Sequence, residues 1–129
     1  MSKQAKPQGY SSVSPYLMVN GAQRVIDFLK QTFSATDLRR YERPDGSLMH
    51  AEVRIDDTVV MIADSTAQWP PYSASIHVYV PDVDATFRRA LDPGAVKIQD
   101  PAQQGGDPDR RGGVKDPAGN SWWIATPVA

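Results

Sequence analysis

The chain has 129 residues, of which 40% are hydrophobic and 22% are charged, and its formal net charge is −1. This composition is typical of one globular domain and excludes a strongly basic nucleic-acid-binding surface. The absence of cysteine excludes disulfides and thiolate metal sites, and no apolar run reaches the roughly 20 residues that span a bilayer. The opening stretch MSKQAKPQGY lacks the apolar core of a secretory signal. We therefore expect a single cytoplasmic domain, residues 1–129, that binds neither nucleic acid nor membrane.

Two stretches of the chain share one plan, in which a strand is followed by a polar turn and an amphipathic helix. SPYLMVNGAQRVIDFLKQTF begins at Ser14, and SIHVYVPDVDATFRRAL begins at Ser75. Aligning Val19 with Val80 matches the two polar turns and the apolar positions of the two helices. Because internal repetition marks a repeated structural unit, we infer two related modules, residues 11–65 and 74–127.

The first module is predicted to be a strand, a helix and three further strands. A strand at 11–19 leads to Asn20, a good helix N-cap, and Gln23 completes a capping-box pattern. The helix then presents one apolar stripe that ends at Phe33. The remaining strands are expected at 36–43, 48–55 and 58–63.

The second module is predicted to repeat this order. Asp82 caps a helix that Pro93 and Gly94 end. The stretch QQGGDPDRRGG is predicted to be the centre of a long loop at 100–113, between short strands at 95–99 and 113–115. A last strand at 121–127 follows the turn DPAGN, and its two adjacent tryptophans point to opposite faces.

Four groups of motifs cover the chain from about residue 7 to residue 126. They are SPYLMV with IDFLKQTF, PDGSLMHAEVRID with VVMIAD, IHVYVPDVDATF, and DRRGGVKDPAGNSWWIAT. Together they resemble the glyoxalase/bleomycin-resistance/extradiol-dioxygenase superfamily, also called the vicinal oxygen chelate superfamily. The resemblance implies an α+β fold of two βαβββ modules, with strands in the spatial order 1-4-3-2, helices outside and an open cup that holds the site. It also implies a homodimer, which in some members pairs modules across subunits.

Metal-dependent members of that superfamily carry a ligand, typically His or Glu, in the first and the last strand of each module. Matching the motifs puts Ser14, Met61, Ser75 and Trp123 at those positions. None is an imidazole or a carboxylate, the groups that Zn²⁺, Ni²⁺ and Fe²⁺ prefer. We therefore predict a pocket without metal or cofactor, unlike that of a standard glyoxalase I or extradiol dioxygenase.

Period-two alternation predicts which side chains line the cup. The lining is aromatic and thioether with a few polar groups, which is typical of a small-molecule pocket. An arginine in the long loop could clamp a carboxylate or phosphonate, although a solvated loop, with one arginine paired to Asp107 or Asp109, is the stronger alternative. The predicted ligand-binding residues are Tyr16, Met18, Arg54, Met61, Ser75, Tyr79, Trp123 and Arg110.

The candidate catalytic groups are His77, His50 and Glu52. His50 and Glu52 share one strand face, so the carboxylate could orient the imidazole for acid–base chemistry. The alternative is a half-exposed polar surface, with Arg54 completing an ion pair. His77 stands two residues after Ser75, and its alternative is a structural histidine. A metal site made by all three groups would require the two modules to converge away from the usual site.

Two classes of function remain open at this level. The first is a metal-free protein of the bleomycin-resistance type that holds an aromatic or cationic small molecule between aromatic walls. The second is a lyase, isomerase or dioxygenase-type enzyme with an atypical His/Glu site. The residues favour the binding protein and leave catalysis open.

Overall fold

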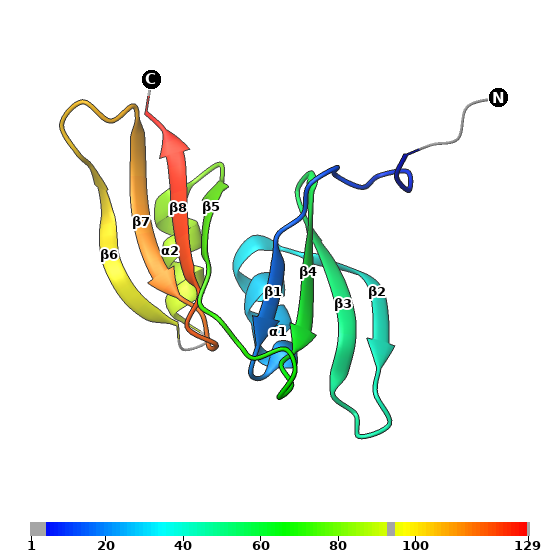
Figure 1. Ribbon diagram of the computed structural model, residues 1–129. Coiled ribbons are helices and arrows are strands. Elements are labelled where there is room, and N and C mark those ends of the chain that lie inside the picture. The colour runs from blue at the N-terminus through cyan, green and yellow to red at the C-terminus, as the bar shows by residue number, and fades with distance from the viewer. Residues whose placement is uncertain (1–4, 93–94, 129) are drawn as a thin grey trace.

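The computed structural model describes residues 5–92 and 95–128 (Figure 1). The chain folds as two modules, and each consists of a strand, a helix and three strands, which confirms the predicted order. The first module contains β1 (Tyr16–Val19), α1 (Ala22–Phe33), β2 (Thr36–Glu42), β3 (Leu48–Ile55) and β4 (Thr58–Asp64). The second contains β5 (Ser75–Tyr79), α2 (Val83–Leu91), β6 (Val96–Gln103), β7 (Asp109–Lys115) and β8 (Ser121–Pro127).

Each module builds one four-stranded mixed sheet, in the order β1-β4-β3-β2 or β5-β8-β7-β6. The first and last strands of a module run parallel, while the other neighbouring strands are antiparallel. This arrangement confirms both the α+β class and the predicted 1-4-3-2 order. Figure 1 shows both sheets as curved, with β1 and β5 at the edges nearest the middle of the molecule.

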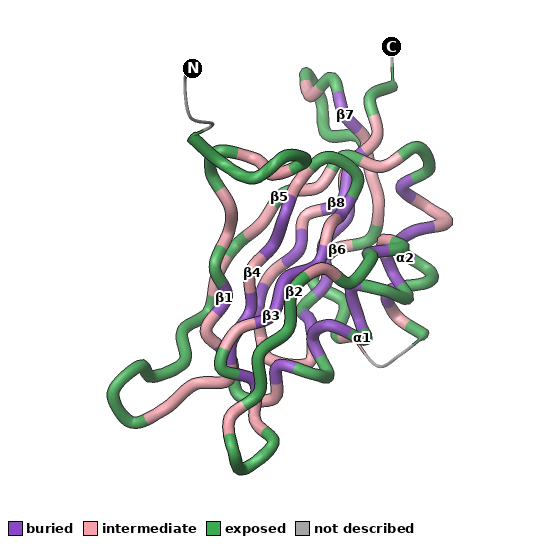
Figure 2. Tube along the Cα trace, turned by 90° about the vertical axis from the view of Figure 1, so that its right-hand side faces the viewer, coloured by how far each residue is buried: buried purple, intermediate pink, exposed green. Residues whose placement is uncertain are grey.

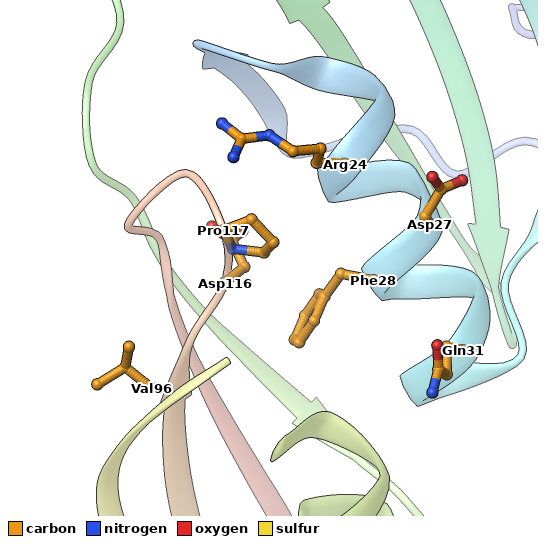
Figure 3. A pocket seen from close by; sticks show the side chains of 7 residues that line it. All are labelled: Arg24, Asp27, Phe28, Gln31, Val96, Asp116 and Pro117. Carbon is orange, nitrogen blue, oxygen red and sulfur yellow. The ribbon is translucent and has the colours of Figure 1, made fainter. Parts of the chain in front are cut away.

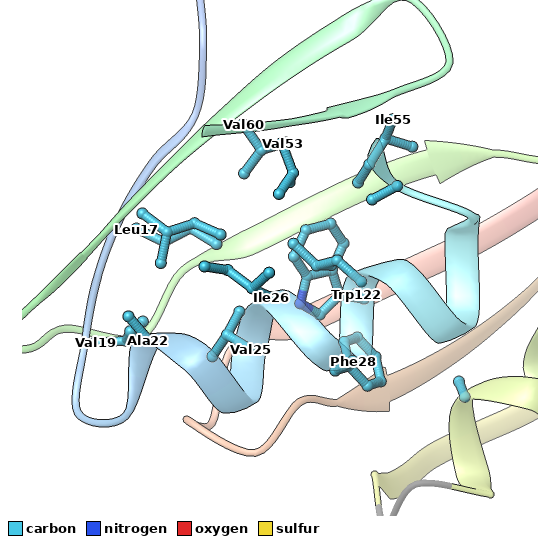
Figure 4. Close-up of a cluster of buried hydrophobic side chains, with 14 of the residues drawn as sticks. Leu17, Val19, Ala22, Val25, Ile26, Phe28, Val53, Ile55, Val60 and Trp122 are labelled. Atoms are coloured by element: carbon cyan, nitrogen blue, oxygen red, sulfur yellow. The ribbon is translucent and has the colours of Figure 1, made fainter. Parts of the chain in front are cut away.

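The two helices share one hydrophobic core with the helix-facing sides of both sheets (Figure 4). Helix α1 packs on its own sheet and also reaches the second one, where Phe33 lies 5.5 Å and Phe28 6.4 Å from the ring of Trp122. Figure 2 shows α1 and α2 on the same side of the molecule, with the buried positions gathered along the inner strands. The opposite face of each sheet therefore points away from this core.

The start of α1 differs from the prediction. Asn20 makes no cap; the N-cap is Gly21, whose φ of 92° lies in the left-handed region that glycine tolerates. The carboxylate of Asp64 accepts hydrogen bonds from the backbone N–H groups of Gly21 (3.2 Å) and Ala22 (2.8 Å). It also accepts one from the N–H of Leu48 (2.7 Å). A residue distant in sequence thus replaces the local capping box, whereas Asp82 caps α2 as predicted.

The predicted long loop of the second module is mostly strand. β6 continues to Gln103 and β7 begins at Asp109, so only a short turn separates them. Ion pairs of Arg110 and Arg111 with nearby carboxylates hold β7 in place. Two smaller differences concern the first strand, which begins at Tyr16 rather than at residue 11, and the helix stop at Pro93-Gly94, which lies outside the described residues.

The turn motif DPAGN has a structural role. The Asp116 carboxylate accepts hydrogen bonds from the indole Nε1–H of Trp122 (2.9 Å) and from the side-chain amide of Asn120 (3.1 Å). Asn120 in turn accepts a bond from the N–H of Ala74 (2.8 Å), which ties the turn to the start of β5. These bonds satisfy the polar groups around a fully buried Trp122. Within residues 5–92 and 95–128, no helix has the length and hydropathy needed to cross a bilayer.

Candidate functional site

The first-module face, meaning the side of the first sheet that points away from the helices, brings His50 and Glu52 together as the sequence predicts. His50 Nε2 lies 2.7 Å from Glu52 Oε2. The other ring nitrogen, Nδ1, lies 3.0 Å from the hydroxyl of Tyr16 on β1. Three of the predicted site residues therefore form one continuous chain of hydrogen bonds across the sheet.

Glu52 is buried, with only 3% of its surface exposed. Burial alone raises the pKa of a carboxyl group, but hydrogen bonds from Tyr10 and His50 outweigh it and hold the pKa of Glu52 below its ordinary value. The Tyr10 hydroxyl donates to Glu52 Oε1 at 2.5 Å, and this bond raises the pKa of Tyr10. Glu52 is thus an ionised carboxylate at neutral pH.

A segment before the first strand covers part of the first-module face, which the sequence reasoning missed. The backbone oxygen of Gly9 accepts a bond from Arg54 (2.9 Å), and the guanidinium of Arg39 lies 5.1 Å from the ring centre of Tyr10. Tyr10 stands 42 residues from Glu52 in the sequence, so no local pattern indicates their contact. The predicted ligand residue Arg54 is consequently engaged by the chain itself.

The second-module face, the corresponding side of the second sheet, carries a different network around Arg111. Its guanidinium pairs with Asp107 and, at 3.0 Å, with Asp109. Its Nε–H also donates to Nε2 of His77 at 3.2 Å. The hydroxyl of Tyr79 donates to the same Asp109 carboxylate at 2.6 Å.

These contacts fix the protonation of the second-module face. Burial and the charge of Arg111 lower the pKa of His77, so its imidazole is neutral at pH 7. The hydrogen bond to Asp109 raises the pKa of Tyr79. The rings of His77 and Tyr79 meet edge to face with centroids 4.8 Å apart, so the two predicted residues form one rigid wall.

Trp123 lies on the second-module face, opposite to the buried Trp122, and it covers Gly113 of β7. A Cβ atom at Gly113 would stand 2.6 Å and 2.7 Å from two carbons of the Trp123 ring. Only glycine leaves room for the indole to lie this close to the sheet. The half-buried ring can therefore offer its other side to a ligand.

The other predicted lining residues are spread over both faces. Met61 pairs with Tyr16 and with Glu52, so it lies in the centre of the first-module face. Met18 and Tyr16 line one pocket of about 360 Å³. His77 and Tyr79 border a groove of about 350 Å³ between β5 and the first module, which Ile76, Val78 and Trp122 also line. Ser75 is exposed on β5 opposite Ser121. One chain thus holds the predicted lining as two separate surfaces.

Arg110 lies on the helix side of β7, away from the predicted cup. Its Nε and Nη2 groups bind both carboxylate oxygens of Asp84 on α2, at 3.0 Å and 2.9 Å. Arg111, which alternation places on the opposite side, is the arginine that reaches His77. The motif DRRGG contains Arg111, but this stretch was predicted to be a loop. Strand alternation, which places Arg110 and Arg111 on opposite sides of β7, was therefore not applied to it.

The positions that hold a metal in metal-dependent relatives do not form a ligand set here. Met61 and Trp123 occupy equivalent places beside the first strands of their modules, and neither side chain suits a divalent ion. His50 and Glu52 belong to the first-module face and His77 to the second. In the part of the chain that the structure describes, no three His, Asp or Glu side chains gather as a potential metal site.

A further pocket, of about 480 Å³, lies on the helix side between α1 and the turn before β8 (Figure 3). Phe28 and Arg24 of α1 face Asp116 and Pro117 across it. Asp116 is already occupied by its bonds to the turn and to Trp122. The pocket contains none of the predicted site residues, so the two sheet faces remain the candidate site.

Residue pairing shows that the two faces are built on equivalent backbone positions. Met61 pairs with Tyr16 and Glu52, while Trp123 pairs with His77 and Gly113. Tyr16 is therefore the counterpart of His77, and Glu52 is the counterpart of Gly113. The same frame presents a carboxylate in one module and an aromatic platform in the other.

Comparisons with known proteins agree with this architecture. Uncharacterized proteins of Mycobacterium bovis and Mycobacterium tuberculosis strain H37Rv are each 39% identical in an alignment 128 positions long. The alignment covers 91% of this chain and 84% and 75% of those proteins, respectively. TioX from Micromonospora sp. ML1 superposes with a TM-score of 0.70 at 21% identity, covering 91% of this chain and 100% of that one. TnmS3, an antibiotic binding protein from Streptomyces sp. CB03234, gives 0.69 at 22%, covering 92% and 99%. FosX, a fosfomycin resistance protein from Mesorhizobium loti, gives 0.67 at 15%, covering 92% of each.

The structural likenesses are below 25% identity and therefore concern the fold alone. The sequence profile of one family covers most of the chain, from residue 11 to residue 124. Its description names the superfamily that the sequence motifs resemble. The chain belongs to the Glyoxalase/Bleomycin resistance protein/Dioxygenase superfamily.

Proposed function

We propose that the protein binds a flat aromatic small molecule, which stacks on Trp123 in a cup that needs no metal or cofactor. The observation that carries this proposal is the close seating of the Trp123 ring on Gly113. A ring held against backbone loses little freedom when a ligand stacks on it, and stacking adds about 0.5–1.5 kcal/mol beyond the buried area. The metal-free character rests on Ser14, Met61, Ser75 and Trp123, none of which suits a divalent ion.

The surroundings of Trp123 favour an organic ligand over a small ion. His77, which pairs with Trp123 across the strands, and Tyr79 provide a second aromatic surface on the same face. Arg111 pairs with two carboxylates, so its guanidinium is not left unpaired to attract a phosphate. The relative TnmS3 is described as an antibiotic binding protein, which agrees with this class of ligand.

We infer further that a second copy of the chain completes the cup. In one chain Trp123 lines neither of these two pockets, so a ligand that stacks on it would stay open to water on its other side. Within the described residues β5 pairs only with β8 and β1 only with β4, so each has an edge that pairs with no other strand. Along that edge of β1, Tyr72 donates hydrogen bonds to the backbone oxygens of Met18 and Tyr16. Ile76 and Val78 line the groove beside β5 and are half-buried there. A symmetric partner would cover these edges and set the first-module face of one copy against the second-module face of the other.

A fluorescence titration tests the platform. Proflavine, 2-naphthol and naphthalene-2-sulfonate supply flat rings with positive, no and negative charge. We expect at least one to quench tryptophan fluorescence saturably. We expect Gly113→Ala to weaken that binding by about two- to tenfold, because the added methyl group displaces the ring and its stacking energy is lost.

Gly105→Ala is the matched control, since a Cβ there meets no atom within 4 Å. It should bind like the wild type. Equal affinities of Gly113→Ala and Gly105→Ala for every bound probe would contradict the platform, and so would quenching that persists in Trp123→Phe with the same amplitude.

A further inference from the structure

The first-module face contains a chain of polar atoms that binding alone does not require. Glu52 Oε2 contacts His50 Nε2 at 2.7 Å, and His50 Nδ1 contacts the Tyr16 hydroxyl at 3.0 Å. Exposure rises along this chain, from 3% at Glu52 to 38% at Tyr16. A buried carboxylate is thus connected through an imidazole to a phenol at the surface.

The hydrogen-bond partners determine where the protons lie. Glu52 is ionised and can only accept, so the Nε2 atom of His50 carries a proton and donates it. In the neutral imidazole Nδ1 then holds a lone pair, and the O–H of Tyr16 donates to it. Burial raises the pKa of Tyr16, so this phenol keeps its proton at neutral pH. Tyr16 is 38% exposed, so a lone pair of its hydroxyl oxygen remains available to a ligand.

We propose that Tyr16, His50 and Glu52 form a proton-accepting relay, which removes a proton from an acidic O–H or C–H group of a bound aromatic or carbonyl compound. This proposal rests on the proposed function in one respect, which is that the substrate binds in the same cup. Tyr16 is the group that touches the substrate. His50 and Glu52 act through it and are positioning residues.

The step is balanced without any oxidant or reductant. The X–H bond of the ligand breaks, its proton joins the Tyr16 oxygen, and the electron pair stays on the ligand as an enolate or phenolate. At the same time the original Tyr16 proton moves to His50 Nδ1. The resulting imidazolium is stabilised by the Glu52 carboxylate, with which it already shares a hydrogen bond. Return of the proton to another atom of the ligand gives an isomer.

The second-module face shows what the relay requires. His77 occupies the place of Tyr16, but its Nε2 accepts a bond from Arg111, a group that does not release its proton. Gly113 stands where Glu52 stands in the first module. The second face therefore has no carboxylate at the position of Glu52, and Nε2 of its imidazole is already bonded to Arg111.

The test uses 5-nitrobenzisoxazole, a flat bicyclic compound that releases a coloured cyanophenolate when a base removes one C–H proton. We expect the kcat/KM of the wild type to exceed the second-order rate constant of free imidazole. We expect kcat/KM to fall by about 10²-fold in each of Tyr16→Phe, His50→Asn and Glu52→Gln, the usual contribution of a positioned base. Tyr41→Phe is the matched control, because Tyr41 lies near His50, with ring centroids 6.3 Å apart, without belonging to the chain of bonds. It should keep the wild-type rate.

A wild-type rate no greater than that of imidazole overturns the relay, and so do unchanged rates in Tyr16→Phe and Glu52→Gln.

Two further readouts separate chemistry from folding and from binding. Long-range ¹H–¹⁵N spectra should show the Nε2–H tautomer of His50 in the wild type and in Tyr41→Phe, and its loss in Glu52→Gln; an Nδ1–H tautomer in the wild type overturns the relay. Quenching of Trp123 by the same probe reports binding independently. Binding without relay-dependent turnover rejects the relay and leaves the proposed function standing, whereas relay-dependent turnover without any Trp123 signal rejects the stacking platform alone.

Discussion

The two sheet faces use the same backbone frame for different chemistry. At equivalent positions the first module carries Tyr16 and Glu52, and the second carries His77 and Gly113. The first face carries a hydrogen-bonded chain of polar side chains that the segment before β1 partly covers. The second carries the Trp123 ring seated on Gly113, beside an Arg111 that pairs with two carboxylates. Internal duplication thus supplies two surfaces, and the side chains at a few matched positions decide what each surface does.

The largest expected effect is a difference in the free energy of unfolding between substitutions on the two sides of β8. Trp122 is fully buried against Phe28 and Phe33 and bonded to Asp116, so Trp122→Ala should lower the free energy of unfolding by about 3–5 kcal/mol. Trp123→Ala should cost less than half of that, because Trp123 is half-buried. Urea unfolding followed by circular dichroism measures both. Equal losses would mean that Trp123 serves the core and not a ligand.

A smaller effect tests the carboxylate that distinguishes the first face. Glu52→Gln should lower the free energy of unfolding at pH 7 by about 1.5–3 kcal/mol, the range for hydrogen bonds to a charged group. In the wild type the pKa of the Glu52 carboxyl is held below its ordinary value. The stabilisation by this carboxylate is therefore complete above the unfolded-state pKa of about 4.3, and it is lost as the pH falls through the lower native-state pKa. The difference from the wild type should therefore shrink between about pH 5 and pH 3.

Glu42→Gln provides the matched control for that titration. Glu42 forms an exposed pair with Arg40, and such pairs contribute about 0–1 kcal/mol. A difference between wild type and Glu52→Gln that stays constant down to pH 3 would show that the Glu52 carboxylate is not held ionised.

The smallest expected effect compares how the two helices begin. Asp82→Ala removes one bond to a backbone N–H of α2 and should cost about 0.5–1 kcal/mol. Asp64→Ala removes bonds to three backbone N–H groups and should cost about 2 kcal/mol, at the upper end for a cap. Thermal unfolding of the two variants checks the order. A larger loss for Asp82→Ala would contradict the cap supplied by Asp64.

The sequence predicted the features that depend on local periodicity. Alternation placed His50 and Glu52 on one strand face, and Ser75, His77 and Tyr79 on another, and the structure has them there. The repeated βαβββ order and the strand order were also correct. These features could be predicted because each is encoded by residues within one strand or helix, together with the family resemblance.

Contacts between distant segments could not be predicted in this way. The cap of α1 comes from Asp64, and Tyr10 binds Glu52 from 42 residues away. The ion pairs of Arg110 and Arg111 turn a Gly- and Pro-rich stretch into strand, against its local turn propensity. In each case a tertiary interaction outweighs a local preference.

Native mass spectrometry with proflavine tests the central claim most directly, because it measures the partner and the ligand together. We expect a dimer that carries up to two proflavine molecules, one for each cup, and a Gly113→Ala dimer that carries several-fold less proflavine at the same subsaturating concentration. A wild-type monomer that binds proflavine as well as any dimer, or a Gly113→Ala protein that binds it undiminished, would contradict a cup built on Trp123 between two copies.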